Sequence, residues 1–167
     1  MARAMATDPF HNFRFHVSAS KVGGTDMLGA ATAGFTTCTL PTQTQEIAEY
    51  KEGTWVFRRK FLGDTTFDDI TLSRGVTTAS SEFHLWMLAA RQGKEYRSDI
   101  KIKQFHRKNI SSQNDFSALK PSRVIKCFEA LPVTSKPGSD LESTNSDISV
   151  QEITIGMEYF EVTNSNT

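Results

Sequence analysis

Short stretches of alternating apolar and polar residues run along almost the whole chain, and this pattern constrains the fold most strongly. In the first stretch, Phe13, Phe15 and Val17 fall on one face. Arg14 and His16 fall on the other face. A period of two is typical of a β-strand with one buried face. The strands predicted from this pattern are Phe10–Ala19, Glu46–Phe61, Phe67–Ser73, Ser98–Lys108, Ser122–Leu131 and Ser149–Val162.

One apolar segment, Ser81–Ala90, does not follow this period and is predicted to be a helix. Phe83, Trp86 and Met87 fall on one stripe at helical spacing. Further apolar residues widen this stripe almost all round, so both sides of the helix are expected to have packing partners. A serine is available to cap the start of the helix, and Gly93 is expected to end it.

These patterns predict a mainly β fold, a small β-barrel with one α-helix. Residues 1–167 are expected to form a single domain, with residues 1–7 and 163–167 flexible at its ends. Only 38% of the residues are hydrophobic, but twelve of these are Phe. Such a composition suits a thin core between β-sheets.

The charge balance limits the classes of function. Nineteen Lys and Arg residues face nineteen Asp and Glu residues, so the formal net charge is zero. A dedicated nucleic-acid binder would normally carry a strongly basic face. Near-zero net charge also removes long-range repulsion between copies and therefore permits self-association. No apolar run reaches the ~20 residues that span a bilayer, so no membrane anchor is expected and the chain is predicted to be made in the cytoplasm.

No pattern in the sequence indicates catalysis, a cofactor or a metal. The histidines do not show the paired spacing of a metalloprotease helix, and no phosphate loop, nucleophile elbow or paired-cysteine motif is present. Asp68 and Asp69 are neighbours on a predicted strand, so their side chains point to opposite faces. We therefore expect no catalytic residues, no cofactor and no metal site, and an enzyme is disfavoured.

The chain has two cysteines, Cys38 and Cys127. Two isolated cysteines are too few for a structural zinc site. The simpler interpretation is that each is a small core residue. A disulfide between neighbouring subunits is the alternative, and it would matter only outside a reducing compartment.

A long hairpin is predicted around Lys51-Glu52-Gly53, with Gly53 supplying a positive φ at the tip. Trp55 and Phe57 follow the tip and share one face. Their large apolar side chains are expected to pack against another surface. Either these side chains pack on their own barrel, or the arm reaches another subunit. Both possibilities stay open from the residues alone.

Several segments, taken in order, carry a resemblance to a known family. They are Asp8-Pro9-Phe10 with Phe13, Ala33-Gly34-Phe35, Tyr50-Lys51-Glu52-Gly53, Ile70-Thr71-Leu72-Ser73-Arg74-Gly75-Val76, Trp86 and the closing segment Ser149–Phe160. Together they resemble the tail tube proteins of contractile-tailed bacteriophages. The same family includes inner-tube proteins of tailocins and of extracellular contractile injection systems.

The resemblance implies two packed antiparallel sheets that form a β-barrel or sandwich with one flanking α-helix. It also implies a structural protein whose hexameric rings stack into a hollow conduit for DNA ejection. In such a ring the edge of each sheet pairs with the neighbouring subunit. The implied partners are further copies of the chain, a contractile sheath protein, baseplate and tail terminator proteins, and the tape measure protein and DNA in the lumen. The implied location is the virion tail, assembled in the host bacterial cytoplasm. The alternative is the inner tube of a tailocin or injection system that carries protein cargo.

The resemblance also assigns roles to particular residues. The candidates for contact between rings are at the hairpin tip: Tyr50, Lys51, Glu52, Gly53 and Trp55. The helix is expected to pack through Phe83, Trp86 and Met87. Polar outward positions of the first, fourth and last strands are expected to line the lumen, including Lys101 and Lys103.

Two other classes of protein compete with a tube subunit. A monomeric ligand-binding β-barrel would need a roomy interior, whereas twelve Phe and two Trp residues favour a filled one. A hydrolase whose catalytic residues meet only in three dimensions would leave no motif in the sequence. The ligand-binding barrel would also leave the polar hairpin without a function.

Overall fold

Antiparallel strands make up most of the chain in the computed structural model, which describes residues 14–20, 28, 34–78, 81–105, 120–141 and 147–164. The elements are β1 (Phe15–Ala19), β2 (Thr37–Cys38), β3 (Gln43–Tyr50), β4 (Arg59–Phe67), β5 (Ile70–Gly75), α1 (Glu82–Arg91), β6 (Ser98–Gln104), β7 (Arg123–Lys136), β8 (Val150–Gly156) and β9 (Tyr159–Asn164). The predicted mainly β fold with one helix and antiparallel sheets is confirmed.

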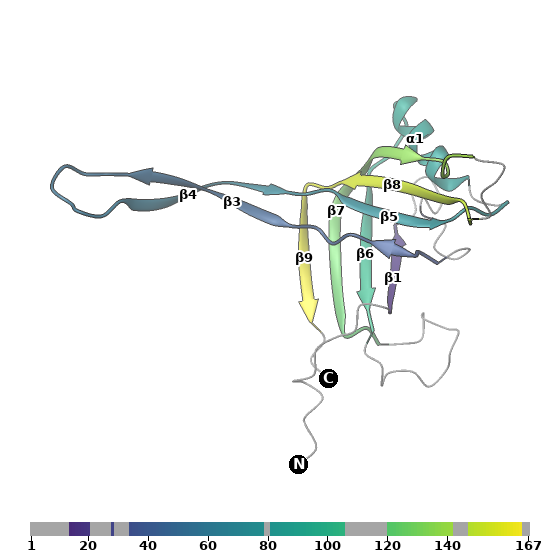
Figure 1. Cartoon of the computed structure of the whole chain (residues 1–167), viewed down its shortest axis with the longest axis horizontal. Coiled ribbons are helices and arrows are strands. Elements are labelled where there is room, and N and C mark those ends of the chain that lie inside the picture. The colour runs from purple at the N-terminus through teal and green to yellow at the C-terminus, as the bar shows by residue number, and fades with distance from the viewer. Residues whose placement is uncertain are drawn as a thin grey trace, which may run out of the picture.

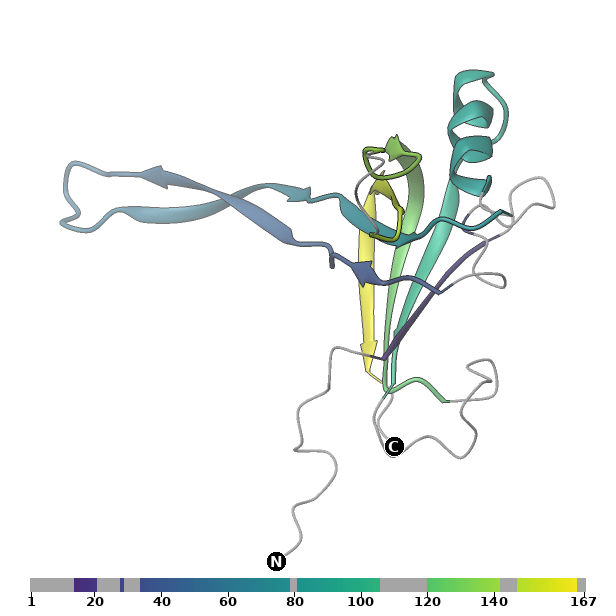
Figure 2. The same cartoon turned by 45° about the vertical axis from the view of Figure 1, so that its right-hand side comes forward.

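The strands form one seven-stranded sheet that folds into two layers, and a separate two-stranded sheet, β3–β4. Layer I has the order β1-β6-β7-β9, in which the first half of β7 pairs with both β6 and β9. Layer II has the order β2-β5-β8-β7 and uses the second half of β7. Figures 1 and 2 show β7 passing from one layer to the other. Among the described strands, the path does not close into a barrel, so the sandwich form of the prediction holds.

A bend in β7 lets one strand serve both layers. Residues Arg123–Phe128 pair with β9, and residues from Leu131 onward pair with β8. Between them Glu129 has a φ of 52°, and the register with β6 and β8 shifts on either side. An extra residue in one strand bends it and increases its twist. The bend therefore turns a long strand around the corner of the sandwich.

Several of the predicted strands have different bounds in the structure. The strand predicted for Phe67–Ser73 is β5, Ile70–Gly75, and the strand predicted from Ser98 ends at Gln104. The strand predicted to end at Leu131 continues to Lys136, because Pro132 lies beside a register irregularity where its missing N–H is tolerated. The single closing strand predicted for Ser149–Val162 is two strands, β8 and β9. The chain leaves layer II after β8 and enters layer I at β9, so one continuous strand cannot serve both.

The hairpin prediction is right in kind and wrong in detail. The second arm begins at Arg59 and continues to Phe67, so Trp55 and Phe57 lie in the loop 51–58 rather than in a strand. Gly53 does not have a positive φ; among the described residues only Gly93 and Glu129 do. A loop of this length can reverse the chain without a left-handed residue at its tip.

The core lies between the two layers and is closed at one end by α1. Layer I contributes Val17, Ile100, Ile102, Ile125, Cys127 and Ala130, and layer II contributes Ile70, Leu72, Ile153 and Ile155. Leu28, Phe83 and Trp86 join the same cluster. The apolar side chains that alternate along the strands of both layers therefore point toward each other, as in a β-sandwich.

Helix α1 ends as predicted but begins differently. Gly93 has a φ of 67° just beyond the last turn, a conformation that glycine adopts without the penalty of a Cβ. Ser81 occupies the N-cap position but makes no side-chain capping hydrogen bond. Glu82, in the first turn, instead accepts a hydrogen bond from Arg74, so an ion pair to the sheet supports the start of the helix.

Some sequence predictions fall on residues that the structure does not describe. These are the flexible start at residues 1–7, the opening motif Asp8-Pro9-Phe10, and residues 165–167 at the other end. Thr163 and Asn164 belong to β9, where they pair with Val124 and Arg123. Within the described residues, no helix is long and apolar enough to cross a membrane.

Candidate assembly surfaces

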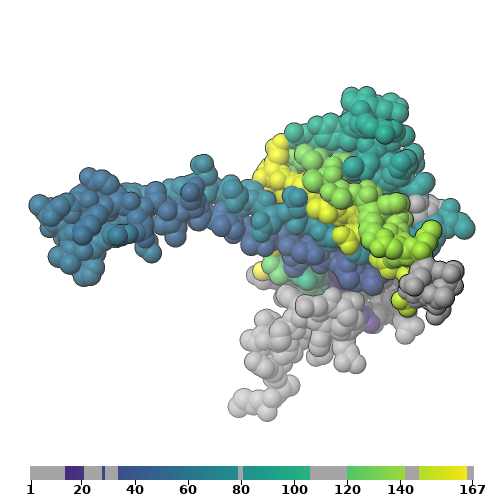
Figure 3. All heavy atoms as spheres, turned by 45° about the horizontal axis from the view of Figure 1, so that its top comes forward, coloured from purple at the N-terminus to yellow at the C-terminus, as the bar shows by residue number. Residues whose placement is uncertain are grey.

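The hairpin β3–β4 forms an arm that projects away from the layers (Figures 1 and 3). All of β3 is exposed, and β4 is exposed except at Phe67. Near the base of the arm, the ring of Phe67 contacts that of Phe160 edge-on, with 5.7 Å between the centroids. A two-stranded hairpin without further cover is marginally stable in water. We therefore expect the arm to be stabilised by contact with another molecule.

The arm carries many exposed apolar side chains. They are Ile47, Tyr50, Trp55, Val56, Phe57, Phe61 and Leu62. Val56 is 84% exposed and Phe57 is 73% exposed. Many exposed apolar side chains on one element of a folded protein are typical of an interaction site.

Ion pairs follow the distal part of the arm. A nitrogen of Arg58 lies 3.0 Å from an oxygen of Glu49, and Lys60 Nζ lies 3.8 Å from the same carboxylate. Arg59 lies 3.7 Å from Glu52 and its guanidinium stands 5.8 Å from the ring centroid of Trp55. All these groups are substantially exposed, so the pairs contribute little to stability but leave basic side chains at the end of the arm.

The residues predicted to contact another ring occupy this distal end. Tyr50 is the last residue of β3, and Lys51, Glu52, Gly53 and Trp55 lie in the loop. Sequence reasoning did not include Ile47, Val56, Phe61 and Leu62 among the candidates. In the sequence, these apolar residues stand among polar residues of the predicted hairpin, and they fall on both of its faces. That pattern is the signal that could have identified them.

The outer face of layer I carries the predicted lumen residues. Lys101 is exposed and Lys103 is half-buried, on the face opposite the buried Ile100 and Ile102. Across the strands, one outer row is Ser18, Lys101, Lys126 and Glu161, and the next is His16, Lys103, Val124 and Thr163. The face is polar and carries both signs of charge.

The two outer strands of layer I have one open edge each. Within the described chain, β1 pairs only with β6, and β9 pairs only with β7. Figure 2 shows both strands at the borders of the layer. Open edges present unpaired N–H and C=O groups and are templates for pairing with another chain.

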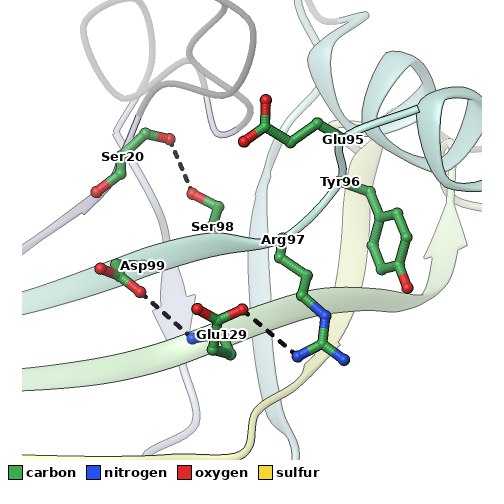
Figure 4. A pocket seen from close by; sticks show the side chains of 7 residues that line it. All are labelled: Ser20, Glu95, Tyr96, Arg97, Ser98, Asp99 and Glu129. Atoms are coloured by element: carbon green, nitrogen blue, oxygen red, sulfur yellow. Dashed lines mark hydrogen bonds and ion pairs between the residues drawn. The ribbon is translucent and has the colours of Figure 1, made fainter.

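A polar pocket lies at the corner where the layers meet (Figure 4). Its lining residues are Ser20, Glu95, Tyr96, Arg97, Ser98, Asp99 and Glu129. Arg97 donates hydrogen bonds to Glu129, at 3.4 Å, and to Glu158. The bond to Glu158 is the main cause that raises the pKa of Arg97 above its usual value. Glu129 and Glu158 sit at the two places where the chain changes layer, so one guanidinium joins both bends.

A buried ion pair joins α1 to layer II. Arg74 is 1% exposed and lies 2.6 Å from a carboxylate oxygen of Glu82. A second nitrogen donates to the carbonyl of Leu28 at 2.8 Å, and the guanidinium stands 4.3 Å from the ring centroid of Phe83. A buried charge with such partners is costly to disrupt from one side. This cluster joins the start of the helix to layer II.

The residues predicted to pack the helix are divided between core and rim. Phe83 and Trp86 are buried, and Met87 is half-buried. The indole Nε1 of Trp86 donates a hydrogen bond to the carbonyl of Tyr96 at 2.6 Å. Leu85, on the opposite side of the helix, is 45% exposed, so one side of α1 faces solvent in the single chain.

Both cysteines are free thiols in this structure. Burial raises the pKa of Cys38 to about 11 and that of Cys127 to about 12. Among the described residues, no group of three or more His, Cys, Asp or Glu side chains could hold a metal ion.

The chain belongs to a family of tail tube proteins. A family model for the T4-like virus tail tube protein gp19 matches residues 11–161. No curated protein matches the sequence significantly.

Solved structures share the fold at low sequence identity. A chain of the sheath-tube complex of an extracellular contractile injection system, PVC, in its extended state, has 20% identity and a TM-score of 0.75, covering 98% of this chain and 100% of that one. A chain of the tube-terminating cap of the anti-feeding prophage has 21% identity and a TM-score of 0.74, covering 98% and 97%. A crystal structure of Hcp protein has 6% identity and a TM-score of 0.53, covering 90% and 99%. Such distant likenesses show the fold alone.

Proposed function

We propose that this tail tube protein forms hexameric rings that stack into the inner tube of a contractile tail. The observation that carries the proposal is the pair of open edges on layer I, β1 on one side and β9 on the other. Pairing β1 of one copy with β9 of the next would continue the antiparallel sheet of layer I around a ring and leave neither border of that layer exposed. The role is structural and involves no catalysis.

In this ring the outer face of layer I forms the wall of the lumen. Lys101 and Lys103 lie on that face, together with Lys126 and Glu161. A wall of one strongly positive sign would hold the phosphates of DNA, whereas a wall of mixed charge lets a polyanion slide. Three of these four charges are basic and one is acidic, so this part of the wall has a net positive charge that would attract a polyanion without reading its sequence.

The arm supplies the contact between rings. Tyr50, Lys51, Glu52, Gly53 and Trp55 lie at its distal end, beyond the reach of the layers (Figure 1). The further partners are a contractile sheath protein, baseplate and terminator proteins, and a tape measure protein with DNA in the lumen. The particle is a phage tail assembled in the bacterial cytoplasm.

A second candidate is the inner tube of a tailocin or extracellular injection system that carries protein cargo. The fold likeness to chains of the PVC and anti-feeding prophage particles favours this candidate. The genes beside this one distinguish the two: capsid and terminase genes indicate a phage, whereas an ATPase with effector genes indicates an injection system.

The test of the proposal is the assembly state of the purified full chain. Sedimentation and negative-stain microscopy are expected to show rings or tubes at high protein concentration. A compact monomer at every concentration would contradict the proposal.

A further inference from the structure

The outer face of layer I carries three lysines on two neighbouring strands, β6 and β7 (Figure 1). Lys101 and Lys103 lie on β6, on the side opposite the buried Ile100 and Ile102, and Lys126 lies on β7. Lys101 pairs directly with Lys126 across the two strands. Alternate residues of a strand share a face and are ~7 Å apart. The three amines therefore share one small area, which we call the lysine cluster.

The lysine cluster contains a repulsive contact that the chain does not neutralise. Side chains of like charge that stand directly opposite each other on antiparallel strands are destabilising. Glu161, on β9, stands opposite Lys126. No ion pair, however, joins any lysine of the cluster to a carboxylate of the described residues. The positive charge of the cluster is therefore available to an anionic partner.

The residues beside the lysine cluster offer little apolar surface. Ser18 stands opposite Lys101, and His16 stands opposite Lys103. Val124, the residue opposite Lys103 on the other side, is half-buried. None of the exposed large apolar side chains of the described chain lies in these two rows. Protein partners depend on buried aromatic and apolar anchors, whereas a phosphate backbone is bound by cationic groups alone. The surroundings of the cluster therefore favour a nucleic acid over a protein.

Acidic groups limit this basic area on the side of the corner. Asp99 lies two residues before Lys101 on the same strand, and its carboxylate accepts a hydrogen bond from the N–H of Glu129 at 3.3 Å. Glu129 and Glu158 both lie beside Arg97. Figure 4 shows Asp99, Glu129 and Arg97 together at this corner. Because like charges repel, these carboxylates would confine a bound polyanion to the rows of the lysine cluster.

We propose that the lysine cluster is a contact site for the phosphate backbone of double-stranded DNA. The proposal rests on the tube function proposed above and names the cargo that touches the wall of the lumen. A DNA duplex carries one negative charge per ~1.7 Å of its axis, so it can place a phosphate near each of three amines that stand ~7 Å apart. Such contacts position the duplex and carry no sequence information.

The first test measures the affinity of the unassembled full chain for a short fluorescein-labelled DNA duplex by fluorescence anisotropy. The cluster variant combines Lys101→Gln, Lys103→Gln and Lys126→Gln. The matched control removes the same charge from the arm and from layer II, by combining Lys51→Gln, Lys60→Gln and Lys136→Gln. At low salt the cluster variant is expected to bind at least tenfold more weakly than the wild type, whereas the control should stay within about threefold. Equal losses in the two variants would show that only the net charge matters and would overturn the proposal.

The salt dependence of binding gives a second readout on the same samples. Each phosphate contact contributes about −0.9 to the slope of log K against log salt concentration. Each single substitution in the cluster is therefore expected to make the slope about 0.9 less steep. Glu161→Gln removes the carboxylate opposite Lys126 and is expected to strengthen binding of the duplex. Slopes that equal the wild-type slope would contradict direct contact between these lysines and phosphates.

The melting temperature tests whether the lysines serve the fold instead. Lys101→Gln removes one of two directly opposed amines, so the unassembled variant is expected to melt about 1–3 °C above the wild type. A variant that melts several degrees below the wild type would show that Lys101 stabilises the sheet, and would overturn the proposal.

Poly-glutamate is the competitor that distinguishes DNA from an acidic protein. An extended polypeptide carries one carboxylate per ~3.4 Å, about half the charge density of the duplex. We expect poly-glutamate to displace the labelled duplex only at a charge concentration at least tenfold above that of unlabelled duplex. Equal competition would indicate an acidic protein as the partner and would overturn the assignment to DNA.

The state of assembly separates this proposal from the tube function. Sedimentation of the wild type and of the cluster variant is measured in parallel. If the wild type forms tubes but binding of the duplex does not depend on the cluster, the contact site is wrong and the tube function stands. If the wild type binds the duplex through the cluster but forms no rings or tubes, the tube function fails and the DNA contact remains.

Discussion

At the scale of single residues, Trp86 combines complete burial with a side-chain hydrogen bond. It is fully buried, packs in the cluster shared by both layers, and donates its indole N–H to Tyr96. Its helix was predicted from apolar spacing, whereas its polar partner was not predictable. Tyr96 lies beyond the end of α1, and only the fold brings its carbonyl to the indole.

Replacing Trp86 with Ala is expected to lower the free energy of unfolding by roughly 3–5 kcal/mol, because the substitution leaves a cavity and an unpaired carbonyl. Leu85→Ala, on the exposed side of the same helix, is the control and should cost less than about 1 kcal/mol. Urea unfolding of the unassembled chains measures both values. Equal effects of the two substitutions would show that the helix does not pack through Trp86.

The cysteines give a second prediction at this scale. Because burial holds the pKa of Cys38 near 11 rather than 9.0, the thiolate at pH 8 is roughly a hundredfold less populated than in an ordinary thiol. Cys127, with a pKa of about 12, should be slower still. Alkylation with iodoacetamide is therefore expected to be at least about a hundredfold slower in the folded chain than in denaturant. A native rate close to that of the denatured chain would contradict the burial of both thiols.

At the scale of elements, the arm combines what could and could not be read from the sequence. A hairpin in this region, with its polar tip, followed from the residues around Lys51 and Gly53. The bounds of β4 did not, because Gly63 and Asp64 are turn-prone by type yet lie within the strand. Pairing with β3 outweighs that local preference, as tertiary context often does for strands.

Deleting Lys51–Gly53 is expected to leave the layers folded and to abolish the stacking of rings. These residues lie in the exposed loop 51–58, outside both strands of the arm, so their loss removes no core contact. Circular dichroism should show the same melting temperature, and negative-stain microscopy should show rings or subunits without long tubes. Normal tubes from the shortened chain would show that the tip does not connect rings.

At the scale of the whole molecule, the two edge strands of layer I, β1 and β9, determine how copies of the chain can associate. Each of β1 and β9 has a described partner on one side only. A protein with two complementary strand edges either blunts them or uses them for association. The near-zero net charge of the sequence removes electrostatic opposition to association.

Amide hydrogen exchange offers a whole-molecule prediction. Peptides from β1 and β9 are expected to exchange at least tenfold more slowly in assembled tubes than in the unassembled chain, because the outward N–H groups of these edge strands, which have no strand partner within the described residues, become paired with a neighbour. Peptides from β6, which lies between β1 and β7, serve as the internal control and should change little. Unchanged exchange at both edges, in particles that are visibly assembled, would rule out ring closure through layer I.

The sequence by itself determined the strand pattern, the one helix, the absence of familiar catalytic motifs and the family resemblance. Each of these depends on local spacing or residue type, which needs no knowledge of the fold. Only the tertiary structure decided that β7 bends at Glu129 to serve two layers, and that Arg97 joins both bends. It also placed apolar side chains on both faces of a free arm. These features depend on register and on contacts between distant segments, which periodicity along the chain does not encode.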